Sequence, residues 1–196
     1  MNIGLYFGSF NPIHIGHLII GSFVANNTNI DQVWYVVSPH NPLKKTSTLL
    51  NEYHRLHLVQ LAIENDPQLK VSDIEFKLPR PSYTIDTLTY LQEKYPSHSF
   101  SVILGSDSWQ NLSKWKNSDT LVKNYPFLVY QRPGFLINEP HQNLTVLQAP
   151  LLEISSTRIR QAIRDKKSIR YLVPDTVRDE IESNSYYLRK LEEPPH

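Results

Sequence analysis

The sequence predicts an α/β protein, an open parallel sheet with helices on both faces. Short apolar segments alternate along the chain with stretches of helical periodicity, the pattern typical of strand–helix–strand units. The first apolar segment, residues 3–7, runs directly into a glycine-containing turn and then into a helix. Polar or glycine residues also follow several later apolar segments. Together these observations favour a Rossmann-like architecture, in which ligands bind beyond the carboxyl ends of the strands.

The elements can be placed in order along the chain. Strands are predicted at residues 3–7, 33–37, 70–71 with Ile74, 101–104 and 127–130, with a shorter one at 145–147. Helical periodicity covers residues 52–64, for which Asn51 is a plausible N-cap, and residues 84–94. Ser155 or Ser156 is expected to cap a third helix, and Pro174 suits the first turn of a fourth. The apolar positions expected to face the core are Leu56, Val59, Ile63, Leu88, Leu91, Ile159, Ile163, Val177 and Ile181.

Length and composition predict one globular domain over residues 1–196, with a small C-terminal helical part from about residue 154. The net charge of +1 argues against a protein that coats nucleic acid. The lack of cysteine excludes disulfides and thiol nucleophiles and fits a cytoplasmic protein. The first residues lack a charged n-region and no apolar stretch approaches about 18 residues, so we expect neither a signal peptide nor a membrane span. The sequence leaves a homo-oligomer open.

The segment after the first strand carries the most information. Residues 8–17 read Gly-Ser-Phe-Asn-Pro-Ile-His-Ile-Gly-His, a tight turn that leads to two histidines at the mouth of a helix. A helix start offers unpaired backbone N–H groups and the positive end of the macrodipole, which suit phosphate. Because His14 and His17 are spaced i, i+3, both rings are expected to point the same way and to donate hydrogen bonds to phosphate oxygens. The alternative is a glycine turn with two incidental histidines. The P-loop motif and the usual zinc-ligand patterns are both missing.

Predicted strand ends supply further candidates at one edge of the sheet. They are Gly8-Ser9, Ser38-Pro39-His40, Gly105-Ser106-Asp107 and Arg132-Pro133. Glycine at positions 8 and 105 would let the backbone approach a ligand closely. Asp107 is expected either to accept hydrogen bonds from a ribose or to order the turn. A local basic pocket can be formed by Lys44, Lys45, Arg132, Arg158 and Arg160.

A second anion site is predicted where Ser155-Ser156-Thr157 opens a helix, with a solvated helix cap as the alternative. Arg160 follows Thr157 at i+3 and can grip phosphate with its guanidinium, whereas Arg158 points elsewhere and is interpreted as surface charge.

Trp115 lies among polar residues, unlike the other two tryptophans. It is expected either to stack on a flat heteroaromatic ring or to anchor two helices. Trp34 and Trp109 are interpreted as packing residues.

Several motifs resemble those of known enzymes. Residues 14–17, His-Ile-Gly-His, resemble the T/H-x-G-H signature of the adenylyl- and cytidylyltransferase superfamily, shared with class I aminoacyl-tRNA synthetases. Residues 154–160 are similar to the I-S-S/A-T-x-I-R motif of small nucleotidyltransferases. Segments resembling bacterial nicotinate-nucleotide adenylyltransferases are residues 82–88 (Ser-Tyr-Thr-Ile-Asp-Thr-Leu), Gly105-Ser106-Asp107, Trp115-Lys116, Gln131-Arg132-Pro133-Gly134 and residues 170–174. The resemblance extends from residue 3 to about residue 187.

This resemblance implies a nucleotidyltransferase-type fold and a specific reaction. The adenylyl group of ATP would pass to nicotinate mononucleotide, giving nicotinate adenine dinucleotide and pyrophosphate in NAD biosynthesis. Catalytic roles are implied for His14, His17 and Arg160. ATP-binding roles are implied for Gly8, Ser9, Phe10, His14, His17, Lys44, Gly105, Asp107, Arg132, Ser155, Ser156, Thr157 and Arg160. Roles in binding the mononucleotide are implied for Thr84, Ile85, Trp115 and Lys116. Mg²⁺ is expected to ride on the ATP phosphates, since no carboxylate cluster offers a metal cage.

The chain departs from the family pattern in two places. Asn11-Pro12 stands where the family usually has Asp-Pro, and a short polar turn former serves either way. Pro42-Leu43-Lys44 has leucine where a histidine is expected, which leaves the role of this loop and of nearby His40 open. Two alternatives also stay open. One is a sibling enzyme acting on nicotinamide mononucleotide, pantetheine phosphate or a phosphocholine-like acceptor, and the other is a non-catalytic ATP-binding module.

Overall fold

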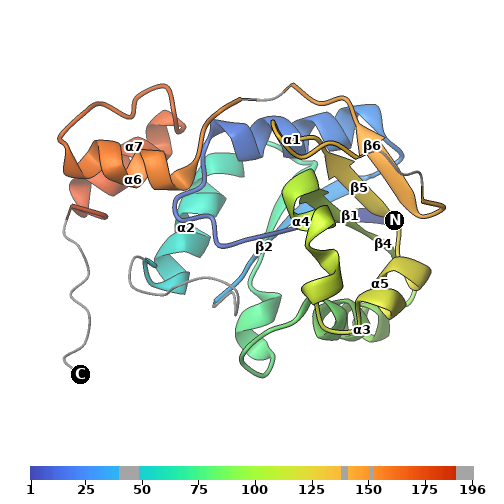
Figure 1. Cartoon of the computed structure of the whole chain (residues 1–196). Coiled ribbons are helices and arrows are strands. Elements are labelled where there is room, and N and C mark those ends of the chain that lie inside the picture. The colour runs from blue at the N-terminus through green and yellow to red at the C-terminus, as the bar shows by residue number, and fades with distance from the viewer. Residues whose placement is uncertain (40–48, 138–140, 151, 189–196) are drawn as a thin grey trace, which may run out of the picture.

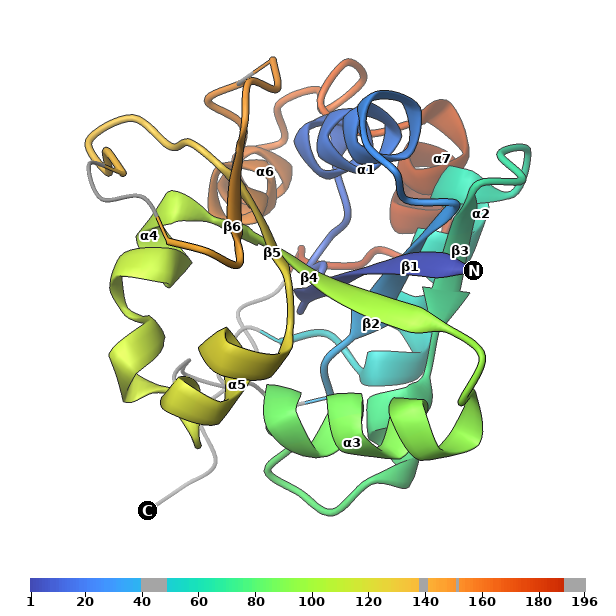
Figure 2. The same ribbon diagram turned by 90° about the vertical axis from the view of Figure 1, so that its right-hand side faces the viewer.

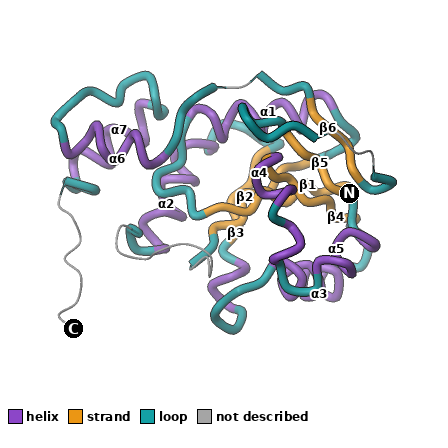
Figure 3. The backbone as a smooth tube through the Cα atoms, in the orientation of Figure 1, coloured by secondary structure: helices purple, strands orange, loops and turns teal. Residues whose placement is uncertain are grey.

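The computed structural model describes residues 1–39, 49–137, 141–150 and 152–188. At its centre lies a parallel sheet of six strands in the order β3-β2-β1-β4-β5-β6 (Figure 3). The strands are β1 (Asn2–Gly8), β2 (Gln32–Val37), β3 (Leu69–Ser72), β4 (Ser99–Gly105), β5 (Phe127–Tyr130) and β6 (Leu144–Leu147). Strand order reverses between β1 and β4, and the crevice at their carboxyl ends is where such sheets bind ligands. The predicted Rossmann-like sheet is confirmed.

Helices follow each of β1, β2, β3 and β4 before the next strand begins, and two more helices follow β6. They are α1 (Ile15–Asn27), α2 (Glu52–Ile63), α3 (Thr84–Lys94), α4 (Ser106–Gln110), α5 (Ser118–Asn124), α6 (Ser156–Arg164) and α7 (Asp175–Ser183), with 3-10 turns η1 (Ile74–Lys77) and η2 (Leu112–Lys114). Two predicted caps are confirmed. The Asn51 side chain accepts the Tyr53 N–H at 2.9 Å, and Ser155 Oγ accepts the Arg158 N–H at 3.3 Å. Pro174 is the N-cap of α7 and thus precedes its first turn.

Helices cover both faces of the sheet, and each face has its own apolar cluster. Figure 2 shows the sheet between α1 and α7 on one side and α3 and α5 on the other. The first cluster joins inward side chains of α1, α2, α6 and α7 to Tyr35, Ile103 and Leu128 of the strands. The second joins α3 and α5 to Ile3, Leu5 and neighbouring strand residues. Of the predicted core positions, all are buried except Leu56, which is half-buried.

The prediction of a strand that includes Ile74 is wrong in one respect. β3 ends at Ser72, and Ile74 instead begins the 3-10 turn η1. Its side chain still enters the second apolar cluster, so the apolar signal came from burial and not from extended backbone.

The C-terminal helices lie against α2 and the start of α1 (Figure 1). The Thr176 hydroxyl donates to the Leu61 carbonyl at 3.2 Å, and the Ile15 N–H donates to the Leu172 carbonyl at 3.0 Å. Ile159, Ile163, Val177 and Ile181 belong to the same apolar cluster as the sheet residues. This packing is what brings the start of α6 to the carboxyl edge of the sheet. No helix in the described part of the chain is long and apolar enough to span a membrane.

Candidate active site

The turn after β1 is built around a buried phenylalanine. Phe10 has a φ of 43°, in the left-handed region that a bulky side chain rarely adopts, and is 2% exposed. Its ring meets those of Tyr6 and His17 edge-on, at centroid distances of 5.8 and 5.1 Å. A Cβ added at Gly8 would lie 2.8 Å from Phe10 Cζ, so glycine is required for the ring to fold back over the turn. With its side chain buried, Phe10 can offer a nucleotide mainly its backbone.

The two histidines lie at the start of α1, and the prediction that they point the same way is confirmed. His14 is the N-cap and His17 the third helical residue. Their rings stack with centroids 3.7 Å apart and planes 23° from parallel. The His14 backbone N–H donates to His17 Nδ1 at 3.3 Å. This bond fixes the orientation of the His17 imidazole relative to the helix start.

His14 is almost entirely buried. Burial, and then the positive charge of Arg132, lower the pKa of His14 from 6.5 to about 4, so the ring is neutral near pH 7. Within the described part of the chain, His14 Nδ1 has no hydrogen-bond partner. A neutral imidazole still donates one N–H, so His14 can bind a phosphate oxygen as a hydrogen-bond donor and not as a cation.

Residues at the ends of β4 and β5 place further polar groups at the carboxyl edge of the sheet. Arg132 Nε lies 3.3 Å from Asp107 Oδ1, and its Nη2 donates to the Tyr130 hydroxyl at 3.2 Å. The Tyr6 hydroxyl donates in turn to the Tyr130 oxygen at 3.1 Å. Although burial disfavours the charge of Arg132, Tyr130, Asp107 and Tyr6 together raise the pKa of its guanidinium.

Neighbouring side chains leave no room for a Cβ at position 105, so glycine is required there. A Cβ there would lie 2.5 Å from Asp107 Oδ1 and 2.9 Å from Arg132 Nε. The sequence predicts that glycine at positions 8 and 105 lets the backbone approach a ligand. In the structure, side chains of the protein fill the space beside both glycines.

The start of α6 converges on the turn after β1, as the two predicted anion sites require (Figure 1). Arg160 Nη1 donates to the Asn11 carbonyl at 2.7 Å, and Nη2 donates to Thr157 Oγ1 at 3.3 Å. The Ser156 hydroxyl donates to the Pro12 carbonyl at 2.8 Å. Arg160 Nε is buried and has no hydrogen-bond partner among the described residues. Arg158, by contrast, is exposed, and its guanidinium donates locally to the Glu153 carbonyl, which agrees with its interpretation as surface charge.

Asn11 shows why the departure from Asp-Pro is tolerated. Its side-chain oxygen accepts the Leu50 N–H at 3.1 Å, which the oxygen of either side chain can do. Its backbone carbonyl holds Arg160.

Sequence reasoning missed Arg55, which joins three segments at the carboxyl edge. This side chain of α2 is fully buried. It donates to the carbonyls of Ser9, Ser38 (2.9 Å), Pro39 (3.1 Å) and Leu50 (2.8 Å). Burial lowers the pKa of Arg55 to about 10, which leaves it charged at neutral pH. Its position in a polar-looking stretch of α2 carried no signal of this role.

Candidate residues for the second substrate lie beside the start of α3. Thr84 is its first residue, and Ile85 is buried. Lys116 Nζ lies 2.9 Å from Asp86 Oδ2 and 4.8 Å from the Tyr83 ring centroid. Trp115 is half-buried against the second apolar cluster, and so are Trp34 and Trp109. Trp115 is therefore anchored on one side while the rest of its indole stays accessible.

Some of the predicted residues cannot be placed. Lys44 lies outside the described residues, as do His40 and the Pro42-Leu43-Lys44 segment.

In the described part of the chain, no three His, Cys, Asp or Glu side chains form a metal-ligand group. Apart from the Asp107 carboxylate, which is paired with Arg132, the groups described at the carboxyl edge are imidazole, guanidinium and backbone N–H donors, and this set does not suit a protein-held Mg²⁺.

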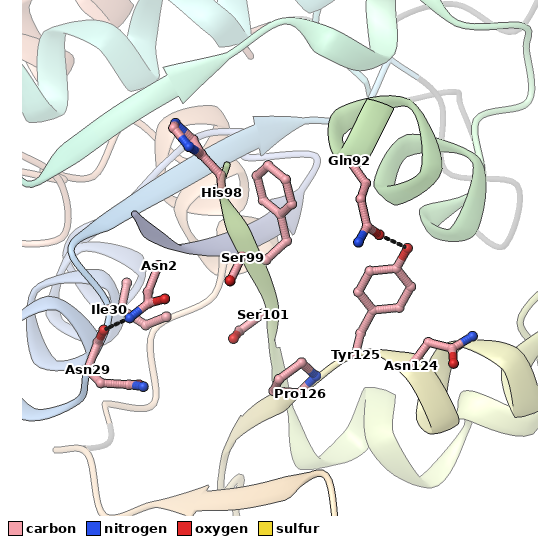
Figure 4. A pocket seen from close by; sticks show the side chains of 11 residues that line it. Asn2, Asn29, Ile30, Gln92, His98, Ser99, Ser101, Asn124, Tyr125 and Pro126 are labelled. Carbon is pink, nitrogen blue, oxygen red and sulfur yellow. Dashed lines mark hydrogen bonds between the residues drawn. The ribbon is translucent and has the colours of Figure 1, made fainter. Parts of the chain in front are cut away.

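A separate pocket lies at the opposite edge of the sheet. Figure 4 shows it between the amino ends of β1 and β4, lined by side chains such as Asn2, Gln92 and Tyr125. Its volume is about 350 Å³, and its lining includes no Asp, Glu, Lys or Arg side chain. The Tyr125 hydroxyl donates to Gln92 Oε1 at 3.0 Å within it. None of the predicted site residues that the structure describes lines this pocket.

Comparison with known proteins shows the family to which this chain belongs. The family model described as cytidylyltransferase-like matches residues 5–162. A probable nicotinate-nucleotide adenylyltransferase of Flavobacterium psychrophilum is 53% identical over 95% of this chain and 99% of its own length. The chain belongs to the nicotinate-nucleotide adenylyltransferase family. A second member, from Cytophaga hutchinsonii, is 52% identical over 95% of this chain and 98% of its own length.

Solved structures of this family share the fold. The Plasmodium falciparum nicotinic acid mononucleotide adenylyltransferase complexed with NaAD matches with a TM-score of 0.82 at 24% identity, covering 97% of this chain and 99% of that chain. The same enzyme complexed with APC matches with a TM-score of 0.80 at 23% identity, with the same coverage. At this level of identity, the likeness supports the nucleotidyltransferase-type fold.

Proposed function

We propose that this chain transfers the adenylyl group of ATP to nicotinate mononucleotide, producing nicotinate adenine dinucleotide and pyrophosphate for NAD biosynthesis. Relatives that are 53% and 52% identical over nearly their whole lengths are named for this activity. The structural observation that carries the proposal is the convergence of α6 on the turn after β1, through the bonds from Arg160 and Ser156. Two helix starts thereby face one crevice, where an extended polyphosphate can contact both.

In the proposed reaction, a 5′-phosphate oxygen of the mononucleotide attacks the α-phosphorus of ATP. The bond between the α-phosphorus and the bridging oxygen breaks, and that oxygen leaves with pyrophosphate. No covalent enzyme intermediate is needed, so catalysis consists of positioning and of stabilising negative charge.

The described residues divide these tasks. His14 and His17 would donate to the oxygens around the α-phosphorus, with the His17 ring held by the His14 backbone. Arg160 and the first N–H groups of α6, with Ser155, Ser156 and Thr157 at the helix start, would hold the departing pyrophosphate. Since the Ser156 hydroxyl proton is used by Pro12, we assign the backbone N–H of Ser156, and not its hydroxyl, to the phosphate. Lys44 would add a further cation.

The nucleoside parts would lie along the strand ends. Gly8, Ser9 and Phe10 on one side and Gly105, Asp107 and Arg132 on the other would border the ATP nucleoside. Thr84, Ile85 and Lys116 would bind the carboxylate of the pyridine ring, with Trp115 stacked on that ring.

Mg²⁺ would be carried on the ATP phosphates, where it would neutralise part of their negative charge. We also propose that residues 1–196 form one domain, that the enzyme works in the cytoplasm, and that nicotinate mononucleotide is preferred over nicotinamide mononucleotide.

The test is pyrophosphate release from ATP and Mg²⁺ with each acceptor in turn: nicotinate mononucleotide, nicotinamide mononucleotide and pantetheine phosphate. Rapid release with the first, and a dinucleotide product of matching mass, are expected. Release with a different acceptor would favour a sibling enzyme. ATP binding with no release for any acceptor would favour a non-catalytic module.

A further inference from the structure

Glu75 is a buried carboxylate that the proposed reaction leaves without a role. It lies in η1 and is 2% exposed. The Ser82 hydroxyl donates to Oε2 at 2.9 Å, and the Thr87 hydroxyl donates to Oε1 at 3.1 Å. The Ser38 hydroxyl also bonds to the carboxylate. Among the ion pairs of the described residues, none involves Glu75, so hydroxyl groups hold its charge.

The three hydroxyls belong to segments that border the proposed acceptor site. Ser38 directly follows β2 at the carboxyl edge of the sheet. Ser82 and Thr87 flank the start of α3, where Thr84 and Ile85 lie. The Tyr83 carbonyl, between them, accepts the N–H groups of Asp86 and Thr87 at 3.0 and 3.1 Å. Glu75 therefore holds both sides of the first turn of α3 and connects that turn to the end of β2.

Ser38 also connects Glu75 to the ATP side of the crevice. Its carbonyl accepts from Arg55, which donates to the Ser9 carbonyl as well. A chain of bonds thus runs from the turn after β1 through Arg55 and Ser38 to Glu75 and α3. In this series of bonds, Glu75 is the residue next to the start of α3, where Thr84 and Ile85 lie.

Stability alone does not explain a carboxylate at this position. Burial raises the pKa of Glu75, which shows that the buried charge is disfavoured despite its hydroxyl donors. A well-packed apolar side chain of similar volume is often no worse for stability than a buried charged group. What the carboxylate adds is directional bonding to three hydroxyls, two that flank the first turn of α3 and one that follows β2, and this fixes the position of the backbone around Thr84.

From this geometry we infer that Glu75 is a positioning residue for the acceptor: it holds the start of α3 so that Thr84 and Ile85 meet the carboxylate of the pyridine nucleotide. This inference rests on the proposed function. It assigns Glu75 an effect on the mononucleotide and little effect on ATP.

The test compares KM for nicotinate mononucleotide with KM for ATP in variants of the full chain. Glu75→Ala is expected to raise the KM for the mononucleotide roughly tenfold, with the KM for ATP within about twofold of the parent. Glu75→Gln should restore most of the loss, because serine and threonine hydroxyls can donate to its amide oxygen or accept from its amide nitrogen. Glu93→Ala removes an exposed carboxylate from α3, the helix that Glu75 holds. It is the matched control and should leave both KM values unchanged.

A purely structural role would lower the melting temperature without changing the ratio of the two KM values, so that ratio decides. An unchanged ratio in a folded Glu75→Ala protein would overturn the inference, and so would an equal rise in both constants. If Glu75→Ala does not fold, Ser82→Ala and Thr87→Val each remove one hydroxyl and are judged by the same ratio. A parent enzyme inactive on nicotinate mononucleotide would overturn the proposed function itself. An active parent with insensitive variants overturns only the role of Glu75.

Discussion

His14 and His17 differ in environment although their rings stack. His14 is buried and neutral, while His17 contacts the Phe10 ring edge-on and is oriented by a bond to the His14 backbone. A preorganised donor contributes most when the protein, and not the substrate, has already fixed its direction. His17 is held in this way before any nucleotide binds.

We therefore expect His17→Ala to lower kcat by about 10²–10³-fold with little change in fold. The ring is partly accessible, so its removal leaves only a small cavity in the first apolar cluster. Steady-state rates and a melting curve of the same preparation check this. Near-parental turnover in a folded variant would exclude His17 from the chemistry.

The burial of His14 predicts a pH dependence of stability. Its pKa is about 4 in the folded protein against 6.5 when exposed, so between these values the unfolded chain binds a proton that the folded chain does not. The contribution of His14 is fully present above pH 6.5 and is lost as the pH falls towards 4, by about 3 kcal/mol in total. Urea unfolding of the parent and of His14→Gln at pH 7 and pH 4 measures the difference. Equal losses in both proteins would contradict the burial of a neutral imidazole.

At the scale of elements, α2 holds the neighbouring segments of the site in place through Arg55. The Arg55 guanidinium donates to backbone carbonyls in the turn after β1, at the end of β2 and just before α2, and so holds these segments together. Guanidinium suits this arrangement because its donors diverge in a rigid plane, which a lysine ammonium lacks. The geometry of the crevice thus depends on a residue that need not touch substrate.

Arg55→Ala is expected to reduce the free energy of unfolding by on the order of 3 kcal/mol, because buried carbonyls lose their donors and a cavity forms. Arg55→Lys should recover only part of this, since it keeps the charge but not the planar fork. Urea unfolding at pH 7 provides the measurement, with Arg158→Ala as an exposed control. A loss below about 1 kcal/mol for Arg55→Ala would show that the carbonyls find other donors.

The same elements show what a sequence can and cannot predict. The strands, most helix faces and the caps at Asn51 and Ser155 follow from local periodicity and capping chemistry, so they were predictable. Arg55 and Glu75 were not, because their partners lie up to 46 and 37 residues away in sequence or are backbone groups without a signature. Ile74 was assigned to a strand because burial and extended backbone give the same apolar signal in a short segment.

At the scale of the whole molecule, the fold brings together residues from opposite ends of the chain. The bond from Arg160 to Asn11 spans 149 residues, and that from Ser156 to Pro12 spans 144. Because α7 packs against α2, and the inward side chains of α6 and α7 share the first apolar cluster with the sheet, the start of α6 is held beside the turn after β1. The two anion sites should therefore behave as one energetic unit.

Arg160→Ala tests whether the two anion sites act together. Arg158→Ala, two residues away on the same helix, is the control. Arg160→Ala should lower kcat/KM for ATP by roughly 10–100-fold and weaken product inhibition by pyrophosphate, since a charged hydrogen bond to phosphate is lost. Arg158→Ala should change neither, because the Arg158 side chain is exposed and donates to the nearby Glu153 carbonyl. When Arg160→Ala is combined with His17→Ala, the fold-loss of kcat/KM should be smaller than the product of the two single losses. This is expected for groups that act on the same transition state. Fully multiplicative losses would mean that the two helix starts act independently and do not share one triphosphate.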